Sequence, residues 1–159
     1  MNAFPIKLAE VIRVVLRLFL GGFYLLAGAF KIKDPGAFAE AVGNFRLVPH
    51  ELTNLVAITL PWIEGAAGLF LILGIWEKAS VWLINALTFV FIAGITSAIA
   101  RGLNIDCGCF GTVGARKVGL TAVAEDAALL ACGLWLVWKI RDNRTRSTTP
   151  QAALPFPTH

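Results

Sequence analysis

The sequence predicts an integral membrane protein of the all-α class, built as a bundle of four antiparallel transmembrane helices. The composition is the first reason: 57% of the 159 residues are hydrophobic and only 15% are charged. Soluble domains have about 45–50% apolar and about 25% charged residues, so this chain has too little polar surface to coat a water-soluble globule. Its mean hydropathy of +0.73 points in the same direction. The second reason is that the apolar residues gather in four long stretches.

Each of these stretches has about the length that crosses a bilayer. A helix needs roughly 20 apolar residues to span a hydrocarbon core about 30 Å thick. The stretches cover about residues 11–30, 52–75, 79–100 and 118–138, and they define one transmembrane domain over residues 1–140. Only the short segment 76–78 separates the second stretch from the third, which predicts a tight hairpin. The remaining residues, 141–159, are polar and rich in turn formers, and we expect them to be a disordered tail.

The positions of the basic residues predict the orientation of the bundle across the membrane. Lysine and arginine favour the cytoplasmic side of a membrane protein. They gather before and within the start of the first stretch and after the last one: Lys7, Arg13, Arg17, Lys139, Arg141, Arg144 and Arg146. Both termini are therefore expected in the cytoplasm, with two longer loops, at about residues 31–51 and 101–117, facing outward. A net charge of +4, spread over span ends, suits lipid headgroups and does not predict nucleic-acid binding.

The second outward loop carries the string Asp106-Cys107-Gly108-Cys109-Phe110-Gly111. Two residues apart, cysteine Cα atoms can fall within the ~4.4–6.8 Å range of a disulfide, and Gly108 accepts backbone dihedrals that a side chain would forbid. So small a ring constrains the unfolded chain little, which makes the bond a poor structural staple and an easily exchanged one. Cys107 and Cys109 are therefore predicted to be a redox pair.

Two other roles for the cysteine pair stay open at this point, an inert structural pair and a metal site. Thiolates bind soft metals such as copper(I) and zinc. No histidine lies in the same loop, because His50 belongs to the other outward loop and His159 ends the chain, so no metal site is assigned. Cys132 lies within the last stretch, where a cysteine is more often a small apolar filler than a ligand.

Four further side chains within the stretches are candidates for function. Glu64 lies near the middle of the second stretch, where an ionisable group faces the bundle interior or a water-filled cavity. It would either relay the protons that a closing dithiol releases or be a protonated carboxyl that hydrogen-bonds a neighbouring helix. Trp62 would line a quinone pocket or simply pack. Glu125 and Asp126 point about 100° apart on a helix, so one of them is expected to pair with a basic residue of the second outward loop.

The cysteine string resembles the signature of the MauE family of methylamine-utilisation membrane proteins, which lies within the broader DoxX-like group. Two further blocks agree with this resemblance: Gly28-Ala29-Phe30-Lys31-Ile32-Lys33-Asp34-Pro35 and Leu60-Pro61-Trp62-Ile63-Glu64. The resemblance covers about residues 11–138, which is the whole predicted membrane part.

The resemblance implies a protein of the bacterial inner membrane that supports maturation of methylamine dehydrogenase, a periplasmic enzyme rich in disulfides. It implies that Cys107 and Cys109 face the periplasm and exchange disulfides with a thioredoxin-like partner similar to MauD. Four-helix proteins of the DsbB type pass thiol electrons to a quinone, which makes a quinone the candidate cofactor by analogy alone. Those proteins use Cys-x-x-Cys and a second pair, both absent here. The chain would thus be a thiol–disulfide oxidoreductase, a non-catalytic assembly subunit for a thioredoxin-like partner, or a soft-metal binding protein.

Overall fold

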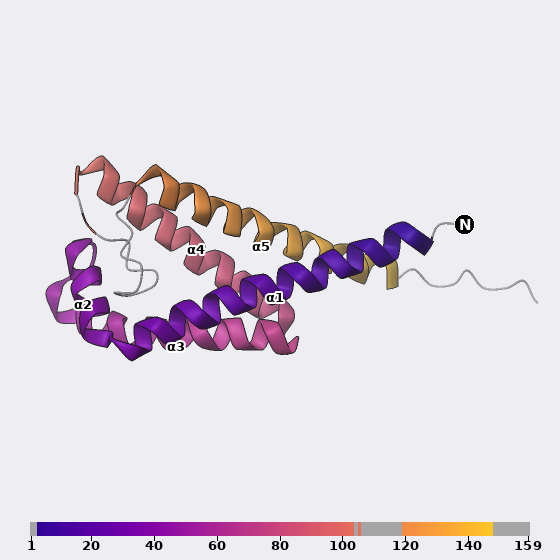
Figure 1. Cartoon of the computed structure of the whole chain (residues 1–159), viewed down its shortest axis with the longest axis horizontal. Coiled ribbons are helices and arrows are strands. Elements are labelled where there is room, and N and C mark those ends of the chain that lie inside the picture. The colour runs from indigo at the N-terminus through magenta and orange to yellow at the C-terminus, as the bar shows by residue number, and fades with distance from the viewer. Residues whose placement is uncertain (1–2, 104, 106–118, 148–159) are drawn as a thin grey trace, which may run out of the picture.

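The computed structural model describes residues 3–103, 105 and 119–147, and within these residues it contains helices and turns but no strand (Figure 1). Four of the helices are long and apolar enough to cross a membrane, and α2 is the exception. This confirms the predicted all-α fold with four spans. The helices are α1 (Ala3–Lys33), α2 (Pro35–Asn44), α3 (His50–Leu73), α4 (Glu77–Ala100) and α5 (Leu120–Ser147).

Two of the spanning helices are longer than the apolar stretches that predicted them. α1 begins at Ala3 and α5 ends at Ser147. Residues 141–147 therefore continue a helix, although the sequence led us to expect a disordered tail from residue 141. They contain no glycine or proline to end it. Residues 148–159 lie outside the described part of the chain.

The first outward loop contains α2, a helix that the search for long apolar stretches could not find. The Asp34 side chain accepts a hydrogen bond of 3.0 Å from the Ala37 backbone N–H, and Pro35 occupies the first turn. Both residues are typical of a helix start. The one buried residue of α2 is Phe38. A single aromatic side chain thus anchors this short helix to the bundle.

The four spans pack as two pairs, α1 with α3 and α4 with α5 (Figure 1). Within the first pair the backbones touch. A Cβ atom added to Gly68 of α3 would lie 2.6 Å from the Gly21 carbonyl oxygen of α1, and one added to Gly28 would lie 2.7 Å from the Pro61 carbonyl oxygen. Glycines allow such close approach, which is a common way for membrane helices to associate.

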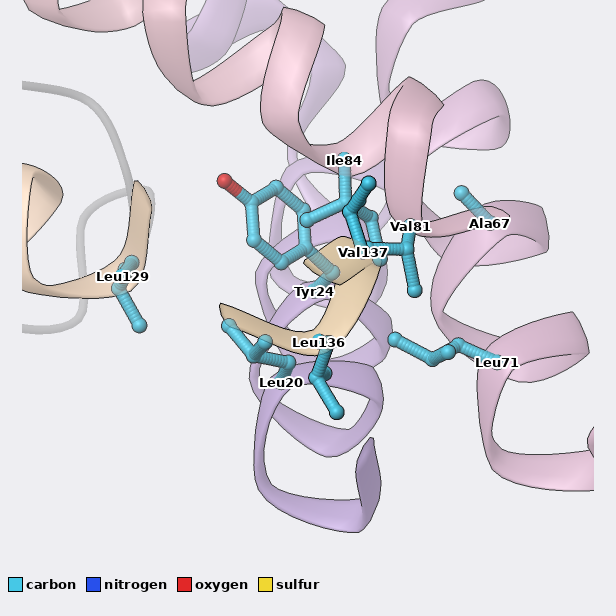
Figure 2. Packing of buried hydrophobic residues seen from close by; sticks show 9 residues of the cluster. All are labelled: Leu20, Tyr24, Ala67, Leu71, Val81, Ile84, Leu129, Leu136 and Val137. Carbon is cyan, nitrogen blue, oxygen red and sulfur yellow. The ribbon is translucent and has the colours of Figure 1, made fainter. Parts of the chain in front are cut away.

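The core lies between the two pairs, toward the end of the bundle that holds the α3–α4 turn. Figure 2 shows Tyr24 of α1 among aliphatic side chains of α3, α4 and α5. The Tyr24 hydroxyl is hydrogen-bonded to the Thr88 hydroxyl of α4, which satisfies both polar groups inside the apolar cluster. The buried members of the cluster are Leu20, Tyr24, Ala67, Leu71, Val81, Ile84, Leu129, Leu136 and Val137.

The turn between α3 and α4 confirms the predicted hairpin, with its residues shifted to 74–76. Gly74 has a φ of 72°, and its N–H donates to the Leu71 carbonyl while the Ile75 N–H donates to the Phe70 carbonyl. This is the Schellman pattern that ends many helices. Trp76 also has a positive φ, 49°, so the chain reverses within three residues.

Candidate functional site

A buried ion pair joins α1 to α3. The Lys31 ammonium donates to both carboxylate oxygens of Glu64, with Nζ 2.8 Å from Oε1 and 2.7 Å from Oε2. Lys31 is only 3% exposed and Glu64 is fully buried. The Lys31 Nζ also lies 5.0 Å from the ring centre of Phe38 and 4.9 Å from that of Phe91. The carboxylate and two aromatic faces therefore together replace water around the ammonium.

Asp126 of α5 adds a third buried charge near the pair. It is 9% exposed, and its carboxylate is close enough to Lys31 to interact with it electrostatically. Its Oδ2 atom is buried and has no hydrogen-bond partner among the described residues. Each of the five helices therefore contributes one residue to this region. We call the five residues the charged cluster: Lys31, Phe38, Glu64, Phe91 and Asp126.

An apolar cavity of about 140 Å³ lies beside the charged cluster. Residues of α2, of the segment that follows α2, of α3 and of α4 line it, together with Lys31 of α1. Lys31 is also the only polar residue among its described lining. The other lining residues are Phe38, Ala41, Val42, Phe45, Leu47, Val48, Val56, Leu60, Val90, Phe91, Gly94 and Ile95.

The end of the bundle that holds α2 also holds the attachment points of the cysteine-bearing loop. α4 ends at Ala100 and α5 begins at Leu120, and both lie at this α2 end, opposite the α3–α4 turn (Figure 1). Cys107 and Cys109 themselves lie outside the described residues. Their segment joins the bundle through Ile105 on one side and Gly119 on the other.

Comparison with known proteins identifies the family. The family model of methylamine utilisation protein MauE matches residues 9–139, which is most of the chain. The chain belongs to the MauE family. The match takes in all four spans, the Lys31–Glu64 pair and the cysteine string. It confirms the resemblance that the sequence blocks carried.

Three curated relatives bear the name methylamine utilization protein MauE. The one from Methylorubrum extorquens is 34% identical over 135 residues, which cover 82% of this chain and 72% of the relative. The one from Paracoccus denitrificans is 31% identical over 75% of this chain and 64% of its own length. The one from Paracoccus versutus is 32% identical over 78% of this chain and 67% of its own length. No solved structure matches the chain.

Among the residues predicted from the sequence of this MauE chain, Glu64 is indeed buried inside the bundle. Its partner is the Lys31 ammonium of α1, so the contact with a neighbouring helix is an ion pair and not the hydrogen bond of a protonated carboxyl. The other expected role of Glu64, a proton relay, stays a prediction. Trp62 lies on the outer face of α3, with 63% of its surface exposed, and it does not line the described cavity. Two residues along a helix correspond to a rotation of about 200°, which explains why Trp62 and Glu64 point in opposite directions.

Lys31 is the residue of this MauE chain that the sequence analysis left out, because it was placed in a loop. The spacing of the buried residues of α1 nevertheless indicates that Lys31 is buried as well. Leu20, Tyr24 and Ala27 are all buried, and Lys31 continues the same pattern of steps of three and four residues. The basic residue therefore extends the buried face of α1 by one more turn.

Proposed function

We propose that this protein is a membrane thiol–disulfide exchanger that supports methylamine utilisation. In this proposal Cys107 and Cys109 face the periplasm of a bacterial inner membrane and react with a thioredoxin-like partner. The partner in turn serves a disulfide-containing client such as methylamine dehydrogenase. Membership of the MauE family supports the pathway, since the family and its relatives are named for it.

The cysteine string is the observation that carries the chemistry. Two thiols separated by one glycine can close and open a disulfide with little strain on the rest of the fold. The loop that bears them is attached at one end of a bundle of membrane-spanning helices, through Ile105 and Gly119. That attachment would hold the pair at a membrane surface, where a soluble partner has access to it.

The proposed exchange needs no reactant beyond the partner, because the Cys107–Cys109 disulfide is the oxidant and the partner's dithiol is the reductant. A thiolate of the reduced partner attacks one sulfur of the Cys107–Cys109 disulfide, and the S–S bond breaks as a mixed disulfide forms. The second partner thiol then attacks the mixed disulfide. The partner leaves as a disulfide, and the protein keeps two thiols with the two electrons and two protons. The reverse sequence oxidises the protein by the same steps.

A trapping experiment tests this function. The chain has three cysteines, so the experiment starts from Cys132→Ser to remove the third. Adding Cys109→Ser leaves Cys107 as a lone thiol, which by the reverse sequence attacks the disulfide of the oxidised partner. Because Cys109 is not there to complete that exchange, a mixed disulfide with the thioredoxin-like partner should accumulate on non-reducing gels and vanish with dithiothreitol. The matched control is the Cys107→Ser, Cys109→Ser, Cys132→Ser chain, which should form no adduct.

Maturation of the client protein decides whether the chain exchanges disulfides or is a non-catalytic assembly subunit. The double variant Cys107→Ser, Cys109→Ser keeps the whole bundle but has no thiol in the loop. Exchange predicts that the client then fails to acquire its disulfides in cells. Full client maturation with this variant would overturn the proposal and leave the protein as a non-catalytic assembly subunit.

A further inference from the structure

We propose that the cavity beside Lys31 binds the headgroup of a single-ring quinone taken from the membrane. The proposal rests on the proposed thiol exchange for its purpose, because it supplies an electron acceptor, but its binding test does not depend on the cysteines. A bound quinone accepts two electrons and two protons, the same number that two thiols release when they form a disulfide.

The polar end of the cavity favours a neutral ligand that accepts a hydrogen bond. An ammonium has three N–H donors, and Lys31 uses two of them on Glu64. The third has no hydrogen-bond partner among the described residues and is available to a carbonyl oxygen. The Glu64 carboxylate already neutralises the lysine, and Asp126 lies near it as a further acidic group. An anionic ligand such as a fatty-acid carboxylate would therefore be repelled.

The size and walls of the cavity favour one aromatic ring. Its volume is about 140 Å³, close to that of an engineered protein cavity of about 150 Å³ that binds benzene. Phe38, Phe45 and Phe91 line it together with aliphatic residues, which offers stacking and edge contacts to a flat ring. A ring of this kind with a carbonyl oxygen directed at Lys31 matches both the polar and the apolar parts of the site.

The cavity also adjoins the surface that faces lipid. Two of its lining residues, Leu47 and Val90, are 52% and 62% exposed. Val90 belongs to α4, one of the spans, so the ring could enter from the bilayer and leave its isoprenoid tail there. A lipid-soluble quinone meets this requirement, whereas a polar metabolite from the periplasm does not.

Direct binding tests the site. The full chain is placed in nanodiscs of phosphatidylcholine and labelled with a photoreactive azido-benzoquinone, and labelled peptides are mapped by mass spectrometry. Label should concentrate on α2, α3 and α4 residues that line the cavity. An excess of decylubiquinone should remove it, and decylcyclohexane, which has the same tail but no carbonyl, should not. Equal competition by decylcyclohexane would overturn the proposal and show a site for acyl chains.

A variant whose new side chain fills the cavity tests whether the quinone binds there. A Cβ on Gly94 would lie 3.6 Å from the Leu47 Cδ1 atom, so Gly94→Leu can be built and directs its side chain toward the cavity while Lys31 and Glu64 stay in place. Gly22→Leu is the control, because no atom lies within 4 Å of a Cβ there. Labelling should fall at least tenfold in Gly94→Leu and stay unchanged in Gly22→Leu. Equal labelling of both variants would overturn the proposal.

A third variant tests the hydrogen-bond donor. Lys31→Met combined with Glu64→Leu removes the donor without leaving an unpaired charge. The affinity for decylubiquinone should fall about tenfold or more, since a hydrogen bond from a charged group contributes about 1.5–3 kcal/mol. Unchanged affinity would overturn the assignment of a carbonyl ligand to Lys31.

Quinone binding and thiol exchange can fail separately. Quinone binding should be the same in Cys107→Ser, Cys109→Ser as in the natural chain, because the binding is assigned to Lys31 and to the apolar residues that line the cavity. Trapping of the partner by Cys109→Ser, in turn, requires no quinone. Loss of quinone labelling with intact trapping would therefore reject the quinone site alone, and the opposite result would reject the exchange alone.

Discussion

Lys31 and Glu64 neutralise each other where neither could remain charged alone. In protein interiors, removing one partner of a buried ion pair costs about 3–5 kcal/mol, because an unpaired charge remains. A neutral hydrogen bond between membrane helices contributes far less, about 0.6 kcal/mol on average. The ion pair shown here therefore changes what a substitution at Glu64 should do, since a protonated bridge would have made Glu64→Gln nearly silent.

A double-mutant cycle tests the coupling of this pair. Lys31→Met should lower the free energy of unfolding by several kcal/mol, because it leaves the fully buried Glu64 carboxylate without its partner. Lys31→Met with Glu64→Leu should recover most of that loss, since an apolar pair of similar volume suits the site. Thermal unfolding of the purified chain in one detergent gives the comparison. Glu64→Leu alone completes the cycle, and losses of the two single variants that simply add in the double variant would contradict the pair.

The same double variant separates a structural from a proton-relaying Glu64. If Glu64 only pairs with Lys31, the stabilised double variant should reoxidise Cys107 and Cys109 in membranes at the normal rate. If Glu64 accepts the released protons, reoxidation should slow at least about tenfold despite normal stability, since general acid–base groups contribute about 10²–10⁴ in rate. We expect the slow rate even at saturating decylubiquinone, which offsets the roughly tenfold weaker quinone binding expected of this variant, with expression level as the control. A normal rate would assign Glu64 to structure alone.

Among the elements, the contact between α1 and α3 is the tightest, because glycine backbones touch there. Gly68→Ala should destabilise the chain by about 1–3 kcal/mol, the usual cost of overpacking, because its Cβ would lie 2.6 Å from two backbone atoms of α1. Gly65→Ala is the matched control one turn earlier, where no atom lies within 4 Å. It should be neutral or slightly stabilising, since alanine favours helix more than glycine does.

Unfolding curves of the two alanine variants give the measurement. Equal stabilities for Gly65→Ala and Gly68→Ala would show that α1 and α3 do not approach as closely as described. A loss in Gly65→Ala alone would point to a different face of α3 as the contact.

The elements differed in how far the sequence could predict them. The spans follow from hydrocarbon thickness, which acts on any apolar stretch of sufficient length. α2 is only ten residues long, so its Asp34-Pro35 start was the one signal available. Lys31 was assigned to a loop because the apolar stretch ends before it, although helix α1 continues to Lys33. Apolarity marks where lipid begins and ends, and a helix can extend beyond that limit.

For the whole molecule, the orientation in the membrane stays a prediction that labelling can test. With both termini in the cytoplasm, a thiol reagent that cannot cross membranes should modify Cys107 or Cys109 in intact spheroplasts after reduction. A cysteine introduced by Ser147→Cys, at the end of α5, should react only after the cells are lysed. Labelling of that cysteine in intact cells would reverse the orientation and place the cysteine string in the cytoplasm.

The sequence did not predict how the four spans pair in the whole molecule or where the cavity forms. Apolar helices in lipid have no hydrophobic reason to choose one neighbour over another, so pairing depends on shape and on buried polar contacts. The chain has 15 glycines, and only the three-dimensional packing shows that Gly21, Gly28 and Gly68 lie at the contact of α1 with α3. The cavity likewise requires α2, α3 and α4 to be placed together, which no local pattern encodes.

The three-residue turn between α3 and α4 bears on the directions in which the spans cross the bilayer. Three residues span about 10 Å at most, far less than a hydrocarbon core of about 30 Å. α4 therefore begins at the membrane surface where α3 ends, and the two helices cannot cross the bilayer in the same direction. Once α3 has taken its direction across the bilayer, the direction of α4 is determined. The topology of the four spans thus has one fewer independent choice of direction than the span count suggests.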